Sequence, residues 1–168
     1  MIITVFGSSE PTKKGYQEAY KLGEKIGSLG YTLQNGAYGG TMEACAKGCQ
    51  KSGGKVIGVG VKGHQIDKMK EPNDFNSEVI ECENIFKRIQ RMLECDLIVV
   101  LRGSIGTLEE LFAAWIHAME HKAPKILIVG EEMIALLDFL INNNFLRKEH
   151  FVFVEKVSNI SGINKYLD

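Results

Sequence analysis

The hydrophobic positions of this chain form short apolar runs that alternate with stretches of helical period. The apolar runs, rich in Val, Ile and Leu, predict strands at 2–6, 31–33, 56–61, 79–82, 97–101, 126–129 and 151–154. Apolar residues spaced by three or four predict helices at 12–29, 41–51, 84–95, 107–121 and 133–142, with a short helix after the last strand. Residues 62–77 are polar and without a clear period, which predicts a long loop.

Strands that alternate with helices predict an α/β fold. Because parallel neighbours need crossover connections, we expect a Rossmann-like, doubly wound, mainly parallel sheet with helices on both faces. The unbroken apolar run at 97–101 is typical of a strand buried on both faces. The pattern contains no repeat or linker, so we expect a single domain over residues 1–168.

Three of the turns that follow predicted strands are rich in glycine or serine: Gly7-Ser8-Ser9, residues 35–40 and residues 103–106. In such sheets ligands bind at the carboxyl ends of the strands, beside the reversal of strand order. Glycine lets backbone amides approach a ligand, and the following helix presents its positive end, so these turns predict a phosphate site. Plain turn geometry is the alternative for any one of them. No GxxxxGK[ST] sequence occurs, and the first turn does not fit GxGxxG, which argues against a P-loop or a standard dinucleotide site.

The sequence around these turns resembles the Lonely Guy (LOG) family. The segments VFGSSEP, NGAYGGTMEACAKG, FKRIQRML and RGSIGTLEEL follow the order and spacing of that family over most of the chain. The resemblance implies a Rossmann-like nucleotide-binding domain and phosphoribohydrolase activity. Such an enzyme hydrolyses the N-glycosidic bond of a nucleoside 5′-monophosphate, cytokinin ribotide- or AMP-like, to free base and ribose 5-phosphate.

The family motifs are matched only in part. In the stretch that corresponds to PGGxGTxxE, Arg102 and Ser104 replace the proline and the second glycine. The Arg-Lys pair of the family has its order swapped, as Lys87-Arg88. The glycine-rich GGGxxGxMG pattern corresponds to residues 35–43 and keeps two of its glycines and its methionine. These departures leave open a non-catalytic nucleotide-binding or sensing module of the same fold.

The resemblance implies the following site residues. The catalytic group would be Glu110, Arg88 and Lys87. Phosphate or nucleotide binding would fall to Gly103, Ser104, Ile105, Gly106, Thr107, Arg102, Ser8, Ser9, Gly36, Gly40 and Met42.

Glu110 has two interpretations. The stretch from Thr107 to Glu110 has the spacing of a capping box, in which hydroxyl and carboxylate each bond the other residue's amide at a helix start. By the resemblance it is instead the catalytic glutamate, whose carboxylate would stabilise oxocarbenium-like charge or activate water. Lys87, Arg88 and Arg102 are the cations available to neutralise the phosphate nearby, although Arg102 alone is equally well read as a solvated loop residue.

Few sequence patterns of this chain indicate a metal site or a cofactor site. The HAMEH stretch at 117–121 formally matches the HxxEH of zinc peptidases but lacks a convincing further ligand. The four cysteines include a CxxxC pair, Cys45 and Cys49, which we interpret as small buried hydrophobes. No lysine stands out for a Schiff base with pyridoxal phosphate. We expect neither a metal nor a cofactor.

Composition sets the remaining expectations. With 45% hydrophobic and 24% charged residues and a net charge of −1, nothing points to nucleic acid or a membrane as a partner. No signal peptide is evident, so we expect a cytoplasmic protein. The helices predicted at 84–95 and 107–121 carry more apolar side chains than one sheet face would hide, which predicts a homodimer.

Overall fold

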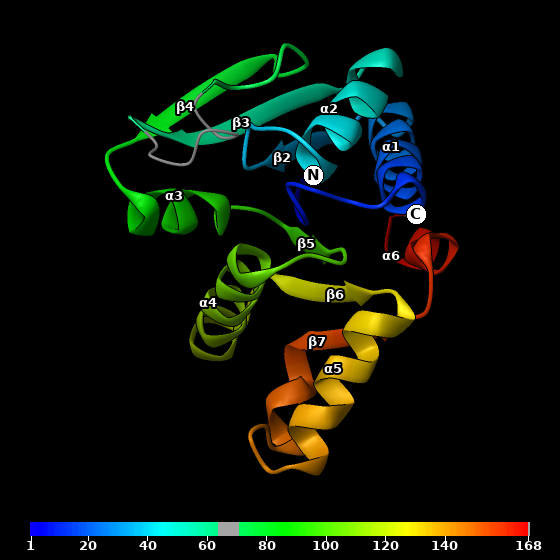
Figure 1. Ribbon diagram of the computed structural model, residues 1–168, viewed down its shortest axis with the longest axis vertical. Helices are drawn as coiled ribbons and strands as arrows, with labels where there is room; N and C mark the ends of the chain where they lie inside the picture. Colours follow the sequence, from blue (N-terminus) through cyan, green and yellow to red (C-terminus); the bar gives the residue numbers. More distant parts are fainter. Residues whose placement is uncertain (64–70, 168) are drawn as a thin grey trace.

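The computed structural model of the protein describes residues 1–63 and 71–167. Its centre is a seven-stranded sheet in the order β4-β3-β2-β1-β5-β6-β7, with every pair of neighbours parallel (Figure 1). The strands are β1 (Ile2–Phe6), β2 (Thr32–Asn35), β3 (Lys55–Val61), β4 (Glu78–Cys82), β5 (Leu97–Val100), β6 (Lys125–Val129) and β7 (Val154–Val157). The predicted Rossmann-like fold is confirmed.

Helices cover both faces of this sheet. They are α1 (Lys13–Ser28), α2 (Thr41–Lys51), α3 (Ile85–Met92), α4 (Ile105–His121), α5 (Glu131–Asn142) and α6 (Asn164–Leu167), with 3-10 helices η2 (Lys148–Phe153) and η3 (Ile160–Ile163). One core joins α1, α2 and the C-terminal residues to one face, and a second core joins α3, α4 and α5 to the other. Strand β5 supplies both cores, with Val99 facing the first and Ile98 facing the second, as its unbroken apolar run predicts.

The last strand is displaced from its predicted place. The sequence predicts a strand at 151–154, but residues 148–153 form η2 and the strand begins at Val154. The ring of Phe151 packs edge-on against the ring of Trp115 in α4, with 4.8 Å between the ring centroids. The indole of Trp115 also donates a hydrogen bond to the His150 carbonyl at 2.8 Å. These aromatic residues therefore belong to a helix-packing contact and not to the sheet.

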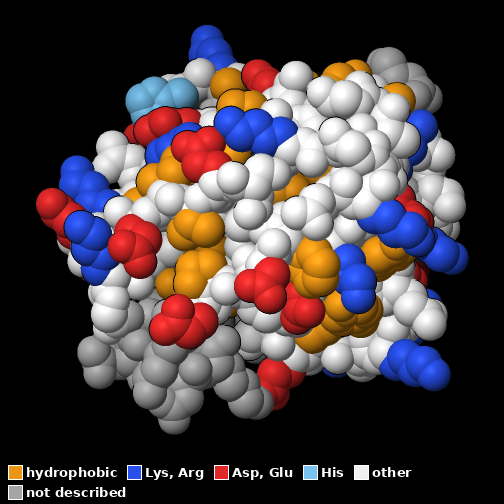
Figure 2. Space-filling view, turned by 90° about the horizontal axis from the view of Figure 1, so that it is seen from above, with side chains coloured by type: hydrophobic (Ala, Val, Ile, Leu, Met, Phe, Trp, Pro, Cys, Tyr) orange, Lys and Arg blue, Asp and Glu red, His pale blue; other side chains and the backbone are white. Residues whose placement is uncertain are grey.

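The surface agrees with the nearly balanced charge of the chain. On the face shown in Figure 2, acidic and basic side chains are interspersed and neither sign forms a continuous field. Among the helices of the described residues, none is long and apolar enough to cross a membrane.

Helices α1 and α2 approach each other closely enough to exclude a side chain at their crossing. A Cβ atom added at Gly23 of α1 would overlap the carbonyl oxygen of Cys45 in α2. Cys45 and Cys49 are both buried in this contact as free thiols, as expected of small hydrophobes. The crossing therefore depends on small residues.

We expect Gly23→Ala to lower the free energy of unfolding by about 1–3 kcal/mol, because overpacking against backbone outweighs the better helix propensity of alanine. Urea unfolding measures this loss. Gly15→Ala, near the start of the same helix, is the control, since its Cβ would make only ordinary contacts with Thr12 and Pro11. It should be neutral or stabilising by up to about 1 kcal/mol. Equal losses in both variants would contradict the close crossing.

Candidate functional site

The strand order reverses at β1, which lies between β2 and β5. The three glycine- and serine-rich turns meet at the carboxyl end of these strands. The Ser8 amide donates to the Arg102 carbonyl at 3.3 Å, and the Thr41 amide donates to the Ser8 carbonyl at 2.8 Å. The turn after β1 thus bonds to both of its neighbours, at the place where such sheets bind ligands.

Backbone fills the space between these turns. Gly40 has a φ of 69°, and a Cβ there would lie against the carbonyls of Ser8 and Ser9. A Cβ at Gly103 would overlap the hydroxyl of Thr107, which is 4% exposed. Gly40 thus allows the turn after β2 to pack directly on the turn after β1, and Gly103 makes room for Thr107 in the first turn of α4.

The capping-box interpretation of Thr107 and Glu110 is wrong. Helix α4 begins at Ile105, two residues earlier than predicted, and its N-cap is Ser104, whose side chain makes no capping hydrogen bond. The first helical bond runs from the Leu108 amide to the Ser104 carbonyl at 3.0 Å. Thr107 therefore lies within the first turn, and Glu110 lies beyond it with its side chain engaged elsewhere.

The start of α4 presents backbone amides that no acceptor of the described residues occupies. The amides of residues 105–107 have no hydrogen-bond acceptor within the described parts of the chain, as expected for the first turn of an uncapped helix. Ser104 and Gly106 are exposed, and a Cβ at Gly106 would meet no atom within 4 Å. An anion has room to approach these amides and the positive end of the helix.

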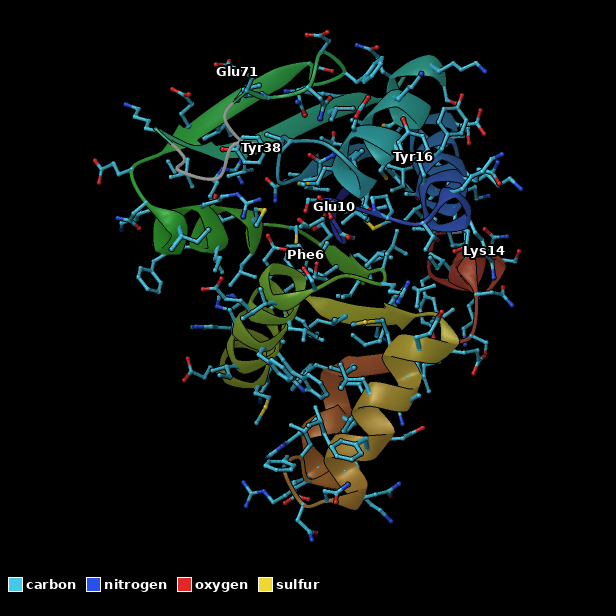
Figure 3. The ribbon with its side chains drawn as sticks, in the orientation of Figure 1. Phe6, Glu10, Lys14, Tyr16, Tyr38 and Glu71 are labelled. Carbon is cyan, nitrogen blue, oxygen red and sulfur yellow. The ribbon has the colours of Figure 1, made fainter. Side chains whose placement is uncertain are left out.

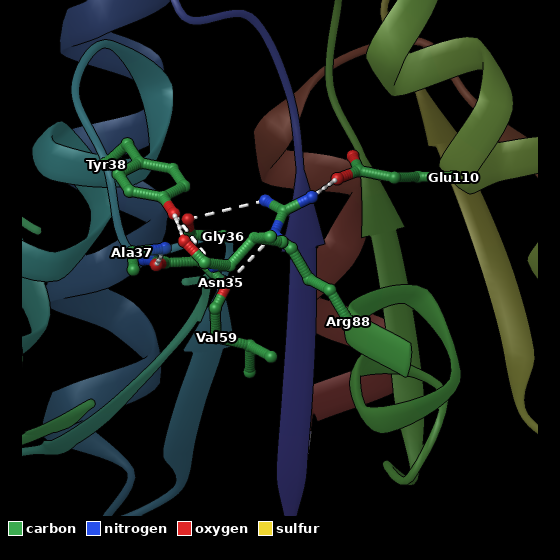
Figure 4. A network of polar contacts seen from close by, with 8 residues as sticks. Asn35, Gly36, Ala37, Tyr38, Val59, Arg88 and Glu110 are labelled. Atoms are coloured by element: carbon green, nitrogen blue, oxygen red, sulfur yellow. Dashed lines mark hydrogen bonds and ion pairs between the residues drawn. The ribbon is translucent and has the colours of Figure 1, made fainter. Parts of the chain in front are cut away.

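Glu110 forms a buried ion pair with Arg88 of α3 (Figure 4). Arg88 Nη1 lies 2.9 Å from Glu110 Oε1, and the two side chains are only 7% and 12% exposed. The remaining nitrogens of Arg88 are also used: Nε donates to the Val59 carbonyl at 2.8 Å and Nη2 to the Gly36 carbonyl at 3.3 Å. The guanidinium thus joins α4, β3 and the turn after β2.

Burial raises the pKa of Glu110 above its usual value, and the charge and hydrogen bond of Arg88 oppose that rise. Arg88 is thus the group that favours the ionised carboxylate. Glu110 lies past the first turn of α4, so the helix dipole contributes little to it.

Residues of the second glycine-rich turn enclose the guanidinium. A Cβ at Gly36 would overlap Arg88 Nη2 and approach the Met42 sulfur, so Gly36 makes room for the arginine. Met42 is 5% exposed and is therefore a wall of the site. The ring of Tyr38 lies 5.9 Å from the Arg88 guanidinium carbon, within cation–π range.

The structure separates the two cations of the swapped pair. Arg88 is 6% exposed and reaches Glu110, whereas Lys87 is exposed and directs its ammonium to Gln90 at 3.4 Å. Arg102 is exposed beside the start of α4. The residue that faces the glutamate is thus an arginine, whatever the order of the pair in the sequence.

A hollow of about 490 Å³ borders the 102–104 turn, and Glu110 is not among its lining residues. Ser8, Ser104 and Arg102 line it, as do Lys14 and Thr41, which the sequence interpretation missed. Thr41 is 2% exposed, so only a small part of it reaches the hollow that it borders. Its position directly after Gly39-Gly40 at a helix start was the available signal. In Figure 3, Lys14 and Tyr38 lie on opposite sides of Glu10, which also borders the hollow.

Metal ligands do not gather at this site. Within residues 1–63 and 71–167, no group of three or more His, Cys, Asp or Glu side chains could hold a metal ion. His117 and His121 of the HAMEH stretch face each other on α4, with ring centroids 4.4 Å apart, but none of the described residues joins them as a third ligand.

Comparison with known proteins places this architecture in a family. The model of the SLOG cluster4 family matches residues 1–157. The chain belongs to the SLOG cluster4 family. It is 33% identical over 116 residues to an uncharacterized protein of Archaeoglobus fulgidus, covering 68% of this chain and 73% of that protein.

One further relative and one solved structure of the same fold bear names that describe an activity or a ligand. The cytokinin riboside 5′-monophosphate phosphoribohydrolase of Mycobacterium tuberculosis is 33% identical over 120 residues, which span 67% of this chain and 61% of that enzyme. The molybdenum cofactor binding protein of Rippkaea orientalis shares the fold, with a TM-score of 0.77 and 21% identity over 99% of this chain and 94% of that one. The similarity to LOG enzymes implied by the motifs is confirmed.

We expect Arg88→Met to lower the free energy of unfolding by about 3–5 kcal/mol near neutral pH, because it leaves the Glu110 carboxylate buried without a counter-charge. Without Arg88 the folded-state pKa of Glu110 should rise further above its unfolded value. The folded state then binds the Glu110 proton more tightly than the unfolded state does. The free energy of unfolding therefore falls as pH rises from the unfolded pKa to the folded pKa of Glu110. Denaturant unfolding should show a smaller loss at about pH 5 than at about pH 8.

The double variant Arg88→Met/Glu110→Gln is the control for this prediction. It removes both charges, so its stability should exceed that of Arg88→Met at about pH 8 and change little with pH. A pH-independent loss in Arg88→Met would contradict the assignment of the titrating group.

Proposed function

We propose that this protein hydrolyses the N-glycosidic bond of a nucleoside 5′-monophosphate, giving free base and ribose 5-phosphate, as a single nucleotide-binding domain. The observation that carries the proposal is the arrangement along α4. The open amides of residues 105–107 can hold a phosphate, and Glu110 stands three residues beyond Thr107 on the same helix, about 4.5 Å along its axis at 1.5 Å per residue. A ribose 5-phosphate held by its phosphate would bring its anomeric carbon toward that carboxylate.

The chemistry follows from the two buried side chains. Arg88 favours the ionised form of Glu110, which stabilises positive charge as the bond between the anomeric carbon and the base nitrogen breaks, or orients the attacking water. Water gives its hydroxyl to the anomeric carbon and its proton to the base nitrogen. Lys87, whose ammonium is directed at Gln90, takes no part in this scheme.

The relative from M. tuberculosis supports this proposal by its name. The matched stretch spans less than two thirds of that enzyme, so the substrate range of the whole enzyme is not carried over. Adenine-like bases, including cytokinins, are the first to test.

A second candidate function is non-catalytic binding of a nucleotide or related phosphorylated ligand. It is favoured by the position of the hollow, whose lining includes Ser104 and Thr41 but neither Arg88 nor Glu110. A ligand held by its phosphate at α4 and extending into this hollow would keep its glycosidic bond away from the carboxylate. The fold shared with a molybdenum cofactor binding protein is compatible with such a role.

The exposed face of α3 and α4 is the surface on which we propose a homodimer. Some of the apolar residues on these helices, such as Ile89 and Trp115, are buried in the monomer. Others remain exposed: Phe86 (75%), Ile105 (84%), Ile116 (61%) and Met119 (43%). Since Ile105 starts α4, a second copy on this face would also border the anion site.

We expect the wild-type protein to release free base from at least one of AMP, CMP, GMP, UMP or a cytokinin riboside monophosphate, as measured by chromatography. Glu110→Gln keeps an acceptor for Arg88 but removes the charge, and should lower turnover at least about a hundredfold with little change in nucleotide affinity.

Glu109→Gln is the matched control, because Glu109 is the exposed neighbour on the same helix and carries the same charge. It should retain turnover within about threefold. Turnover that survives Glu110→Gln would exclude the catalytic role of this carboxylate. Binding of a nucleoside monophosphate without any base release, in the wild type and in both variants, would favour the second function.

For the assembly, we expect a dimer by light scattering at micromolar concentration, and a monomer for Ile116→Lys, because a buried unpaired ammonium opposes association. Phe145→Lys introduces the same charge at another exposed apolar residue, 71% exposed and outside α3 and α4, and should leave the dimer intact. A monomeric wild-type protein would refute the proposed assembly.

A further inference from the structure

A buried alanine adopts a left-handed conformation next to Arg88. Ala37 has a φ of 72° and is 0% exposed. Non-glycine residues adopt this conformation only when surrounding contacts enforce it, and such residues gather at functional sites. Ala37 also stands where the GGGxxGxMG pattern has its third glycine, so this chain has replaced glycine where backbone geometry favours it.

Three asparagines hold Ala37 in place. Asn35, itself 0% exposed, accepts the Ala37 amide at 2.8 Å through Oδ1 and donates to the Met42 carbonyl at 3.0 Å. The Ala37 carbonyl accepts the Asn73 amide at 2.9 Å, Asn73 Nδ2 at 2.7 Å and Asn76 Nδ2 at 3.0 Å. Both backbone polar groups of the alanine are thus bonded to asparagines.

The Ala37 amide belongs to the same rigid peptide plane as the Gly36 carbonyl (Figure 4). In a trans peptide the amide and the carbonyl point in opposite directions. Asn35 Oδ1 fixes the amide end of this plane, and the carbonyl end accepts Arg88 Nη2 at 3.3 Å. The orientation of that plane therefore sets one of the three acceptors that hold the guanidinium.

We propose that Asn35 and Asn73 are positioning residues for the Arg88–Glu110 pair. Asn35 orients the peptide whose carbonyl receives Arg88, and Asn73 holds the left-handed alanine that follows. The consequence for turnover rests on the proposed function, but the effect on the ion pair does not.

The test is Asn73→Ala, read out as the pH midpoint of Glu110 by carboxyl-carbon NMR, with the Glu110 signal assigned by its loss in Glu110→Gln. In this variant Arg88 is held less firmly, so its charge and hydrogen bond favour the ionised form of Glu110 less. The pH midpoint of Glu110 should therefore rise by at least about half a pH unit. Asn73→Ala/Ala37→Gly should return the midpoint to the wild-type value, because glycine adopts a positive φ without help. Ala37→Gly alone should leave it unchanged.

Asn143→Ala is the matched control. Its Nδ2 also donates to a backbone carbonyl, that of Phe139 at 2.8 Å, but at the end of α5. It should lower the melting temperature without moving the Glu110 midpoint. If Asn73→Ala does not fold, Asn76→Ala removes one donor to the Ala37 carbonyl but keeps the bonds from Asn73 Nδ2 to the Ala37 and Tyr38 carbonyls, so it should give a smaller shift in the same direction.

A fall in melting temperature with an unmoved Glu110 midpoint would overturn the inference, as would failure of Ala37→Gly to restore the midpoint. These outcomes are independent of catalysis. Absence of base release with every nucleotide would refute the proposed activity and leave the titration result standing.

Discussion

The burial of one guanidinium organises the carboxyl edge of this sheet. Arg88 is 6% exposed, and a buried arginine is tolerated only with acceptors for its N–H groups and a counter-charge. The chain provides them from three separate elements: the Glu110 carboxylate of α4, the Val59 carbonyl of β3 and the Gly36 carbonyl after β2. Each of these elements must be in place before the arginine can be buried, so the site and the fold of this edge form together.

The parallel topology explains why these elements meet. With β1 between β2 and β5, the turns at the carboxyl ends of all three strands lie side by side. Helix α3 crosses from β4 at one edge to β5 near the centre, which carries Arg88 over the sheet toward α4. Its C-terminal end is fixed by a buried network in which the Thr4 hydroxyl donates to the Met92 carbonyl at 2.9 Å and Gln34 Nε2 donates to the Thr4 oxygen at 2.9 Å. A short amphipathic helix thereby acquires a defined position.

The sequence predicts the elements and the meeting of the loops well, because hydrophobic period and glycine placement are local signals. Prediction from the sequence fails where a contact between residues far apart in the chain sets the position of a side chain. The spacing from Thr107 to Glu110 fits a capping box, but Arg88, 22 residues away in sequence, takes the carboxylate instead. The swapped order of Lys87 and Arg88 looked like a defect in the motif, although the orientation of α3 buries the arginine and exposes the lysine. The apolar run that begins at Phe151 predicts a strand, but Phe151 packs on Trp115 instead. The pattern of residues 35–43 did not reveal that Asn35 and Asn73 hold Ala37, since a left-handed backbone and its side-chain supports are visible only in three dimensions.

The start of α4 differs from the other long helix starts in one physical respect. Thr12 caps α1 and Asn84 caps α3 with side-chain oxygens. The first amide of α2 is bonded to the Ser8 carbonyl, and α5 carries two glutamates in its first turn. Helix α4 has neither a side-chain cap nor an acidic first turn, even though Ser104 is a residue that could cap it. A serine cap stabilises a helix by about 1 kcal/mol, so the chain forgoes this stability at the helix that also carries Glu110. An uncapped positive helix end, exposed at the switch point of the sheet and followed by a buried carboxylate, adds nothing to the stability of the fold, and its free amides support the proposed phosphate site.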